Sequence, residues 1–238
     1  MSSEKPRGSP KYLDLITALF AVILVTSNVA SSAKIVSLGF SVFGVPLAFD
    51  GGTLLFPLSY VLGDVLTEVY GFYAARRVIW IGFACLALSA LAFFVLQILP
   101  PDPTWESYAG SAAYETILGG MSSGGIVIAS LAGYLAGEFS NSILLSKIKT
   151  SFRGSFLWIR TIGSSLVGEL LDSLVFVTIA SLAGVFGWDL FLPLVLTNYL
   201  LKLSVEVIVT PAVYLAVRFL KKREGIDVYD EGITYRLF

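Results

Sequence analysis

Long apolar runs are the feature that most restricts how this sequence can fold. A run of about 20 apolar residues is long enough to cross the hydrocarbon core of a bilayer as a helix. We therefore expect six membrane spans, at Tyr12–Ile35, Gly52–Tyr70, Val78–Leu99, Met121–Leu145, Phe156–Leu182 and Leu190–Leu220. Only 14% of the 238 residues are charged and the mean hydropathy is +0.82, whereas a soluble domain has about 25% charged residues. The sequence predicts an all-α, polytopic integral membrane protein.

The basic residues predict the orientation of these spans. They gather before the first span, between the second and third, between the fourth and fifth, and after the sixth: Lys5, Arg7, Lys11, Arg76, Arg77, Lys147, Lys149, Arg153, Lys221, Lys222 and Arg223. The loops Pro100–Thr116 and Gly184–Asp189 contain none. Because basic loops stay in the cytoplasm, we expect a multi-pass protein of the cell (inner) membrane. Residues 1–11 and 221–238 would be cytoplasmic, and residues 12–220 would form one six-helix bundle.

Several other classes of protein are disfavoured. The net charge of −1 and the lack of a long basic run argue against nucleic-acid binding. One cysteine, Cys85, and no histidine leave neither a disulfide framework nor a zinc site. No catalytic or nucleotide-binding motif is present, so we expect no enzyme activity, metal or cofactor. An intramembrane aspartyl protease built from Asp64 and Asp172 is disfavoured because the flanking motifs are missing.

Two short patterns recur three spans apart. Ser27–Ile35 (SNVASSAKI) matches Ser140–Ile148 (SNSILLSKI), and Ser59–Asp64 (SYVLGD) matches Ser164–Glu169 (SSLVGE). A shift by three spans inverts the second half, so the chain fits two inverted three-helix repeats, an arrangement that places a transporter's substrate site near the membrane midplane. Chance similarity between apolar segments is the alternative. Separately, Gly133 and Gly137 form a GxxxG pattern that favours close helix packing.

Ionisable residues inside the spans are the candidate site residues. A charge at the centre of a membrane helix costs about 2.5–3.5 kcal/mol on insertion scales, so such residues usually face a cavity or a partner. In the second span Tyr60, Asp64 and Glu68 share one face. We expect Asp64 to be the more deeply buried acid, and pairing with Arg76 or Arg77 is the alternative role for Glu68.

The fifth and sixth spans supply the other candidates. Glu169 and Asp172 lie deep in the fifth span, whereas Arg160 lies near its end and is expected to extend to the membrane surface. In the sixth span Lys202 either neutralises Glu206, four residues on, or pairs with Asp64 or Asp172 of another span. The remaining polar candidates are Asn198 beside Lys202 and, with weaker support, Asn28, Glu138 and Asn141.

The segment Phe49–Phe83, which contains FP, TEVYG and ARR motifs around Pro57, Asp64 and Arg77, resembles the queuosine precursor transporter family. The family was first labelled as vitamin uptake transporters. The resemblance continues through Ser164–Phe176 and Leu196–Lys222 and covers most of the chain from Val25 onward. It implies a six-helix membrane protein that imports a 7-deazaguanine such as preQ0, preQ1 or queuine. It also implies the substrate-binding residues Asp64, Asp172 and Lys202, with Glu68, Glu169 and Asn198 as further positions.

The chemistry of such a ligand fits these side chains. A guanine-like edge presents parallel N–H donors that one carboxylate, Asp64 or Glu169, can accept. Tyr60, Phe56 or Tyr199 could stack on the ring. Asp172 with Lys202 would form a pair that the substrate rearranges. We expect a secondary carrier in contact with lipid and a small-molecule substrate, with a homodimer as a possible assembly. The alternative is a vitamin- or nucleobase-capturing membrane subunit that depends on a separate ATPase module.

Overall fold

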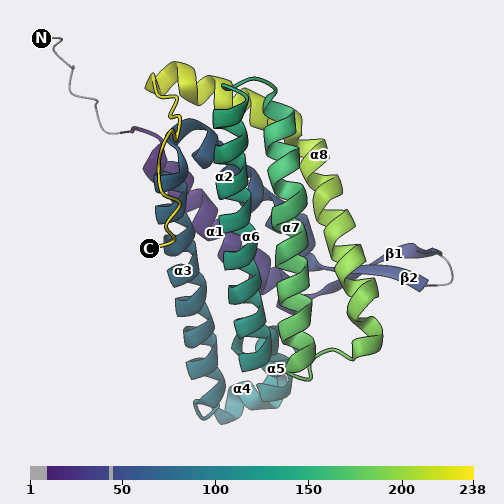
Figure 1. The fold of residues 1–238 in the computed structure, drawn as a ribbon. Helices are drawn as coiled ribbons and strands as arrows, with labels where there is room; N and C mark the ends of the chain where they lie inside the picture. The colour runs from purple at the N-terminus through teal and green to yellow at the C-terminus, as the bar shows by residue number, and fades with distance from the viewer. Residues whose placement is uncertain (1–9, 43–44) are drawn as a thin grey trace, which may run out of the picture.

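The structure, a computed structural model, describes residues 10–42 and 45–238. Helices dominate this part of the chain. The elements in order are α1 (Leu13–Ala33), β1 (Ile35–Val42), β2 (Val45–Asp50), η1 (Gly51–Leu54), α2 (Phe56–Tyr70), α3 (Phe72–Ile98), α4 (Pro103–Tyr108), α5 (Gly110–Ser122), α6 (Gly124–Ser151), α7 (Leu157–Leu182), η2 (Trp188–Leu190) and α8 (Phe191–Glu224). The long helices form one bundle, in which α3, α6 and α7 run side by side and α8 follows α7 (Figure 1).

Five helical segments of the described chain are long and apolar enough to cross a membrane. They are Leu13–Ala33, Phe72–Ile98, Gly110–Ser151, Leu157–Leu182 and Trp188–Glu224. Their outward faces carry many exposed leucine, isoleucine and phenylalanine side chains, as contact with lipid requires. The predicted all-α, polytopic membrane class is therefore confirmed.

The expected count of six full-length spans is not confirmed, because the second is too short. Of the run Gly52–Tyr70, only Phe56–Tyr70 is α-helical, and these 15 residues extend roughly 22 Å at 1.5 Å per residue. The hydrocarbon core is about 30 Å thick. The run begins with the η1 turn, and Pro57 lies in the first turn of α2. Twelve of the 15 residues of α2 are buried, so protein rather than lipid surrounds this short helix.

Other expected boundaries shift as well. The first helix ends at Ala33, and the chain continues as an antiparallel hairpin, β1–β2, that projects from the side of the bundle (Figure 1). The sequence analysis did not predict this hairpin. The third span begins at Phe72, directly after Gly71, whose φ of 83° allows the sharp reversal from α2. The segment expected to begin at Met121 begins at Gly110, as α5 followed by α6.

The predicted close packing at Gly133 and Gly137 is confirmed. A Cβ added at Gly133 would lie 2.8 Å from a carboxylate oxygen of Asp172, and one at Gly137 would overlap the hydroxyl of Tyr60. The Gly137 position would also be 3.0 Å from the backbone oxygen of Gly168 on α7. The missing side chains thus let α7 and the tip of Tyr60 approach the backbone of α6.

Substitution of Gly137 by alanine tests this packing. We expect Gly137→Ala to displace Tyr60 and α7 and to destabilise the protein by about 1–3 kcal/mol, the usual cost of overpacking a core. The measurement is the free energy of unfolding in detergent micelles. Gly184→Ala is a poor control because its φ is positive, so Gly124→Ala, whose Cβ would meet no atom within 4 Å, is the matched variant. Equal stability of the two variants would contradict the packing described here.

The C-terminal residues 225–238 lie across one end of the bundle, which we call the tail end. The backbone N–H of Val228 donates to the oxygen of Val69 at 3.2 Å. Asp230 accepts hydrogen bonds from the backbone of Phe72 at 2.9 Å and from Ser146 at 2.6 Å. In Figure 1 the last part of α8 turns across this end. Pro211, inside α8, accounts for the bend because it removes a backbone hydrogen bond.

Candidate functional site

Most of the buried carboxylates come together on the facing sides of four helices. We call this group the inner carboxylate cluster. Its members are Asp64 on α2, Glu138 on α6, Glu169 and Asp172 on α7, and Glu206 on α8. All five are at most 4% exposed. Because burying a charge without a partner is costly, such a concentration of acids needs neutralising partners from the protein, a ligand or protons.

Asp64 is held by an amide on the neighbouring helix. The side-chain nitrogen of Asn141 on α6 donates to Asp64 Oδ1 at 2.8 Å, and the hydroxyl of Ser165 on α7 donates to the oxygen of Asn141 at 3.3 Å. These bonds fix the orientation of the Asn141 amide, with its N–H towards Asp64. The second oxygen of Asp64 is buried and accepts no hydrogen bond within the described part of the chain, so it remains available to a ligand.

Lys202 supplies a positive charge to the cluster. Its ammonium group forms an ion pair with Asp172 across the α7–α8 contact. The same nitrogen lies 4.5 Å from the centre of the Phe56 ring. Of the two roles proposed for Lys202, the structure therefore contains the pair with a carboxylate of another helix. Asp172 and Lys202 are thereby joined, as the sequence analysis suggested.

Tyr60 reaches into the middle of the cluster. Its phenol is fully buried, and its hydroxyl has no hydrogen-bond partner among residues 10–42 and 45–238. Its charged neighbours are Asp172, Glu138, Glu169 and Glu206. Its ring lies 6.0 Å from that of Phe56, centre to centre. The carboxyl oxygens of Glu138, Glu169 and Glu206 likewise accept no hydrogen bond from an N–H or O–H group of the described residues. The cluster thus offers a ligand several hydrogen-bond acceptors that the described residues leave unused, together with an aromatic face.

A second group of charges lies one turn nearer the tail end, and we call it the tail-end charge cluster. Glu68, fully buried, accepts from Arg160 at 2.7 Å and from Lys221 at 2.6 Å. Lys149 lies 3.8 Å from the same carboxylate oxygen and donates to the backbone oxygen of Glu68 at 2.6 Å. Asp227 completes the group, at 2.6 Å from Lys149 and 2.9 Å from Lys221.

Asp227 links this cluster to the C-terminal tail. Partial burial raises its pKa, but the hydrogen bonds from Lys149 and Lys221 outweigh that effect and hold the pKa of Asp227 below its ordinary value. Lys149 also donates to the backbone oxygen of Val228 at 2.6 Å and lies 4.5 Å from the ring centre of Tyr229. The tail therefore closes over the charges at this end of the bundle.

Three expectations about these charges were wrong. Glu68 pairs with Arg160 and Lys221 rather than with Arg76 or Arg77, because α7 and the end of α8 pack beside α2. Arg160 does not extend to the surface, since it is only 2% exposed and donates to Glu68. The expected difference in burial between the two acids of α2 is absent, since Asp64 and Glu68 are both fully buried, at 1% and 0% exposed.

The other predicted site residues have weaker positions. Asn28 is half-buried and donates to the oxygen of Leu24 in its own helix at 2.9 Å. Asn198 is half-buried on α8, one turn before Lys202. Glu138, one of the weaker candidates, and Glu206, expected only as a possible partner of Lys202, both belong to the inner cluster. Lys149, which the sequence analysis used only for orientation, is buried at the tail end. The signal for Glu138 was its charge inside an apolar run, and its carboxylate lies beside Gly63 of α2.

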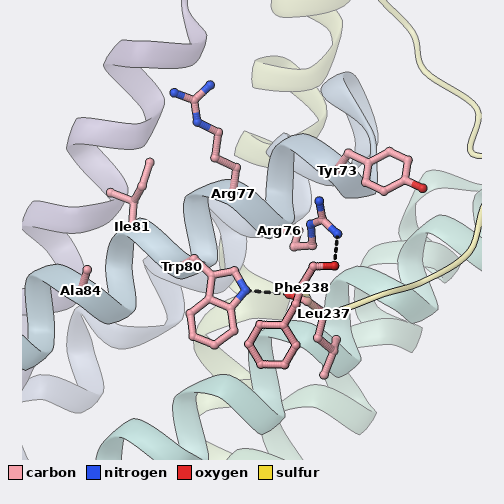
Figure 2. Close-up of a pocket in the computed structure, with 8 residues that line it drawn as sticks. All are labelled: Tyr73, Arg76, Arg77, Trp80, Ile81, Ala84, Leu237 and Phe238. Atoms are coloured by element: carbon pink, nitrogen blue, oxygen red, sulfur yellow. Dashed lines mark hydrogen bonds between the residues drawn. The ribbon is translucent and has the colours of Figure 1, made fainter.

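A surface hollow lies outside the inner carboxylate cluster, between the first turns of α3 and the C-terminal residues. Figure 2 shows its lining at the start of α3, where Arg76 and Trp80 donate hydrogen bonds to the backbone oxygens of Phe238 and Leu237 at 3.1 and 2.7 Å. The hollow has a volume of about 620 Å³ and is wide open to the surroundings. None of its lining residues belongs to the inner carboxylate cluster, so we do not assign the substrate to it.

A bundle of apolar helices with ionisable groups buried between them is characteristic of a protein that moves polar solutes or ions through a membrane. The fold and the inner cluster together define a polytopic membrane transport protein. The chain belongs to the family described as "Putative vitamin uptake transporter", whose profile matches residues 50–216. This range contains the whole inner cluster. Membership of a transporter family places the chain among transport proteins rather than enzymes.

Individual relatives are similar over the same region. The chain is 29% identical over 174 residues to a Bacillus subtilis (strain 168) protein named "Probable queuosine precursor transporter". The aligned region covers 73% of each chain. It is 25% identical over 163 residues to the "Queuosine precursor transporter" of Escherichia coli (strain K12), with 68% of this chain and 66% of that protein covered. A Haemophilus influenzae protein, also named "Probable queuosine precursor transporter", is 23% identical to this chain over 165 residues. No solved structure matches this chain.

Proposed function

We propose that this protein is a secondary carrier that imports a 7-deazaguanine precursor of queuosine, such as preQ0, preQ1 or queuine. The observation that carries the proposal is the set of buried acceptor oxygens to which no N–H or O–H group of the described residues donates, next to aromatic rings. The names of the relatives supply the substrate class. In this proposal the tail end faces the cytoplasm of a cell (inner) membrane, as the distribution of basic residues indicates.

The free oxygen of Asp64 is suited to the guanine-like edge of the base. That edge has two parallel N–H donors, and charge-assisted hydrogen bonds to carboxylates are about twice as strong as neutral ones. Asp172, released from Lys202, would hold the ammonium group of an aminomethyl-bearing precursor. Tyr60 and Phe56 would contact the flat ring. Glu169 is the other candidate for the base edge, and Glu68 and Asn198 stay in the proposal as more distant contributors.

The short helix α2 supports a transport role for this site. Transporters commonly build substrate sites from discontinuous helices near the membrane midplane, at the interface of inverted repeats. Here α2, which is shorter than a full span, carries both Tyr60 and Asp64, and the matching S-x-x-x-G-acid segment of α7 carries Glu169. We propose that these two segments are the corresponding parts of the two repeats.

Uptake of labelled precursor into cells that lack their own importer tests the assignment. We expect Asp64→Asn to reduce uptake by about tenfold or more, because a hydrogen bond to a charged group contributes about 1.5–3 kcal/mol. Asp189→Asn, at an exposed position of the α7–α8 loop, is the matched control. Unchanged uptake by the Asp64 variant at equal expression would contradict the assignment. A thermal-shift panel of 7-deazaguanines and free bases then ranks the substrates.

The competing hypothesis is a capture subunit that needs a separate ATPase module. Purified protein in liposomes separates the two. A secondary carrier exchanges external labelled precursor for internal unlabelled precursor without any other protein, whereas a capture subunit binds the precursor but does not move it. The same preparation shows whether the protein is a monomer or a homodimer.

A further inference from the structure

Glu169 and Glu206 bring two carboxyl groups together between α7 and α8. They are 0% and 1% exposed. Each is close enough to the other for a hydrogen bond, and Glu206 also lies beside the hydroxyl of Ser165. Nevertheless, no N–H or O–H group of the described residues donates to any of the four oxygens. Two groups that in their ionised form can only accept hydrogen bonds therefore face each other.

Electrostatics requires a proton in this contact. Two carboxylates in contact at a buried site cannot both be ionised, and a single proton between them serves as their hydrogen bond. The described titratable groups around the pair, from every helix packed against it, are Tyr60, Asp64, Glu138, Asp172, Tyr199 and Lys202. Lys202 is the one cation in this set, and its ion pair is with Asp172.

Lys202 connects this pair to the substrate site. Asp172 is three residues after Glu169 on α7, and Glu206 is four residues after Lys202 on α8. Residues at these spacings lie on one helix face, about one turn apart. The ion pair Asp172–Lys202 and the carboxyl pair Glu169–Glu206 are thus two successive contacts between the same two helices. The ammonium group of Lys202 can reach one carboxyl on α7 and another on its own helix.

We propose that the Glu169–Glu206 pair stores one proton in the empty carrier and that binding of a cationic substrate displaces it. The inference rests on the proposed function and adds the role of these two glutamates. The substrate's ammonium group takes over Asp172, Lys202 turns to Glu206, and the shared proton passes to water. The O–H bond on the carboxyl breaks as a new O–H bond forms on water. One positive charge enters the cluster and one leaves it.

Linkage makes this exchange measurable without transport. If one proton leaves as the substrate binds, affinity must rise with pH by up to about tenfold per unit. We would measure preQ1 binding to the purified protein in detergent by calorimetry, in buffers that differ in ionisation enthalpy. Wild type is expected to release about one proton per preQ1 bound. PreQ0, which lacks the aminomethyl group and its positive charge, is the matched control ligand, and its binding should release no proton.

Variants locate the proton. We expect Glu206→Gln to bind preQ1 without releasing a proton, since the glutamine amide can donate to Glu169 and preserve the contact. Glu169→Gln should behave in the same way, whereas Glu115→Gln, at an exposed position on α5, should match wild type. Binding of preQ1 by wild type without proton release and independent of pH would overturn the inference but leave the proposed function intact. Failure of every 7-deazaguanine to bind would overturn both.

Discussion

Replacement of Glu68 by glutamine is expected to destabilise the protein by about 3–5 kcal/mol, the cost of breaking a buried ion pair from one side. The loss is large because Arg160 is 2% exposed and directs its guanidinium at Glu68, and an arginine cannot lose its proton inside a protein. Lys221 loses the same partner, at 2.6 Å. A neutral amide accepts a hydrogen bond but leaves these positive charges uncompensated.

The measurement is the free energy of unfolding in mixed micelles during titration with a denaturing detergent. Glu231→Gln, exposed in the C-terminal tail, is the matched control and should stay within about 0.5 kcal/mol of wild type. The double variant Glu68→Gln/Arg160→Met removes the stranded guanidinium and should recover part of the loss. A cost below about 1 kcal/mol for Glu68→Gln would contradict the role assigned to the tail-end charge cluster.

Membrane helices and their buried acids could be predicted from the sequence, but the partners of those acids could not. Apolar runs report contact with lipid directly, because each residue in them contributes to the transfer free energy. The partners of Glu68 lie 81, 92 and 153 residues away, at Lys149, Arg160 and Lys221. Which helices become neighbours depends on packing across the whole bundle, and no local pattern contains that information.

Small residues gave the best local evidence about the site. Gly133 and Gly137 predicted a close helix contact, and the structure places Asp172 and Tyr60 against them. By contrast, the hairpin formed by Ile35–Val42 and Val45–Asp50 was missed because hydropathy identifies apolar runs but not strand pairing in the segment between two expected spans. The shortness of α2 was missed for a related reason. Hydropathy alone does not distinguish a full span from a turn followed by a short helix that is enclosed by protein.

Replacement of Lys202 by methionine should abolish transport but largely keep the fold, whereas the main expected effect of Glu68→Gln is a loss of stability. Removing the ammonium group leaves Asp172 without its ion pair. A carboxylate, unlike a guanidinium, can neutralise itself by taking up a proton. Methionine keeps the long apolar stem beside Phe56. We therefore expect the free energy of unfolding to fall by less than about 2 kcal/mol, below the cost of an uncompensated buried charge.

Transport is expected to fail because a protonated Asp172 no longer offers a carboxylate that a substrate can take over from Lys202. Uptake of labelled precursor by Lys202→Met should drop at least about tenfold, while Lys222→Met, exposed near the end of the same helix, should transport normally. Lys202→Arg keeps the charge and should retain part of the activity. Normal uptake by Lys202→Met would show that the Asp172–Lys202 pair only fastens α7 to α8, whereas unfolding of the variant would show that Asp172 stays ionised without its partner.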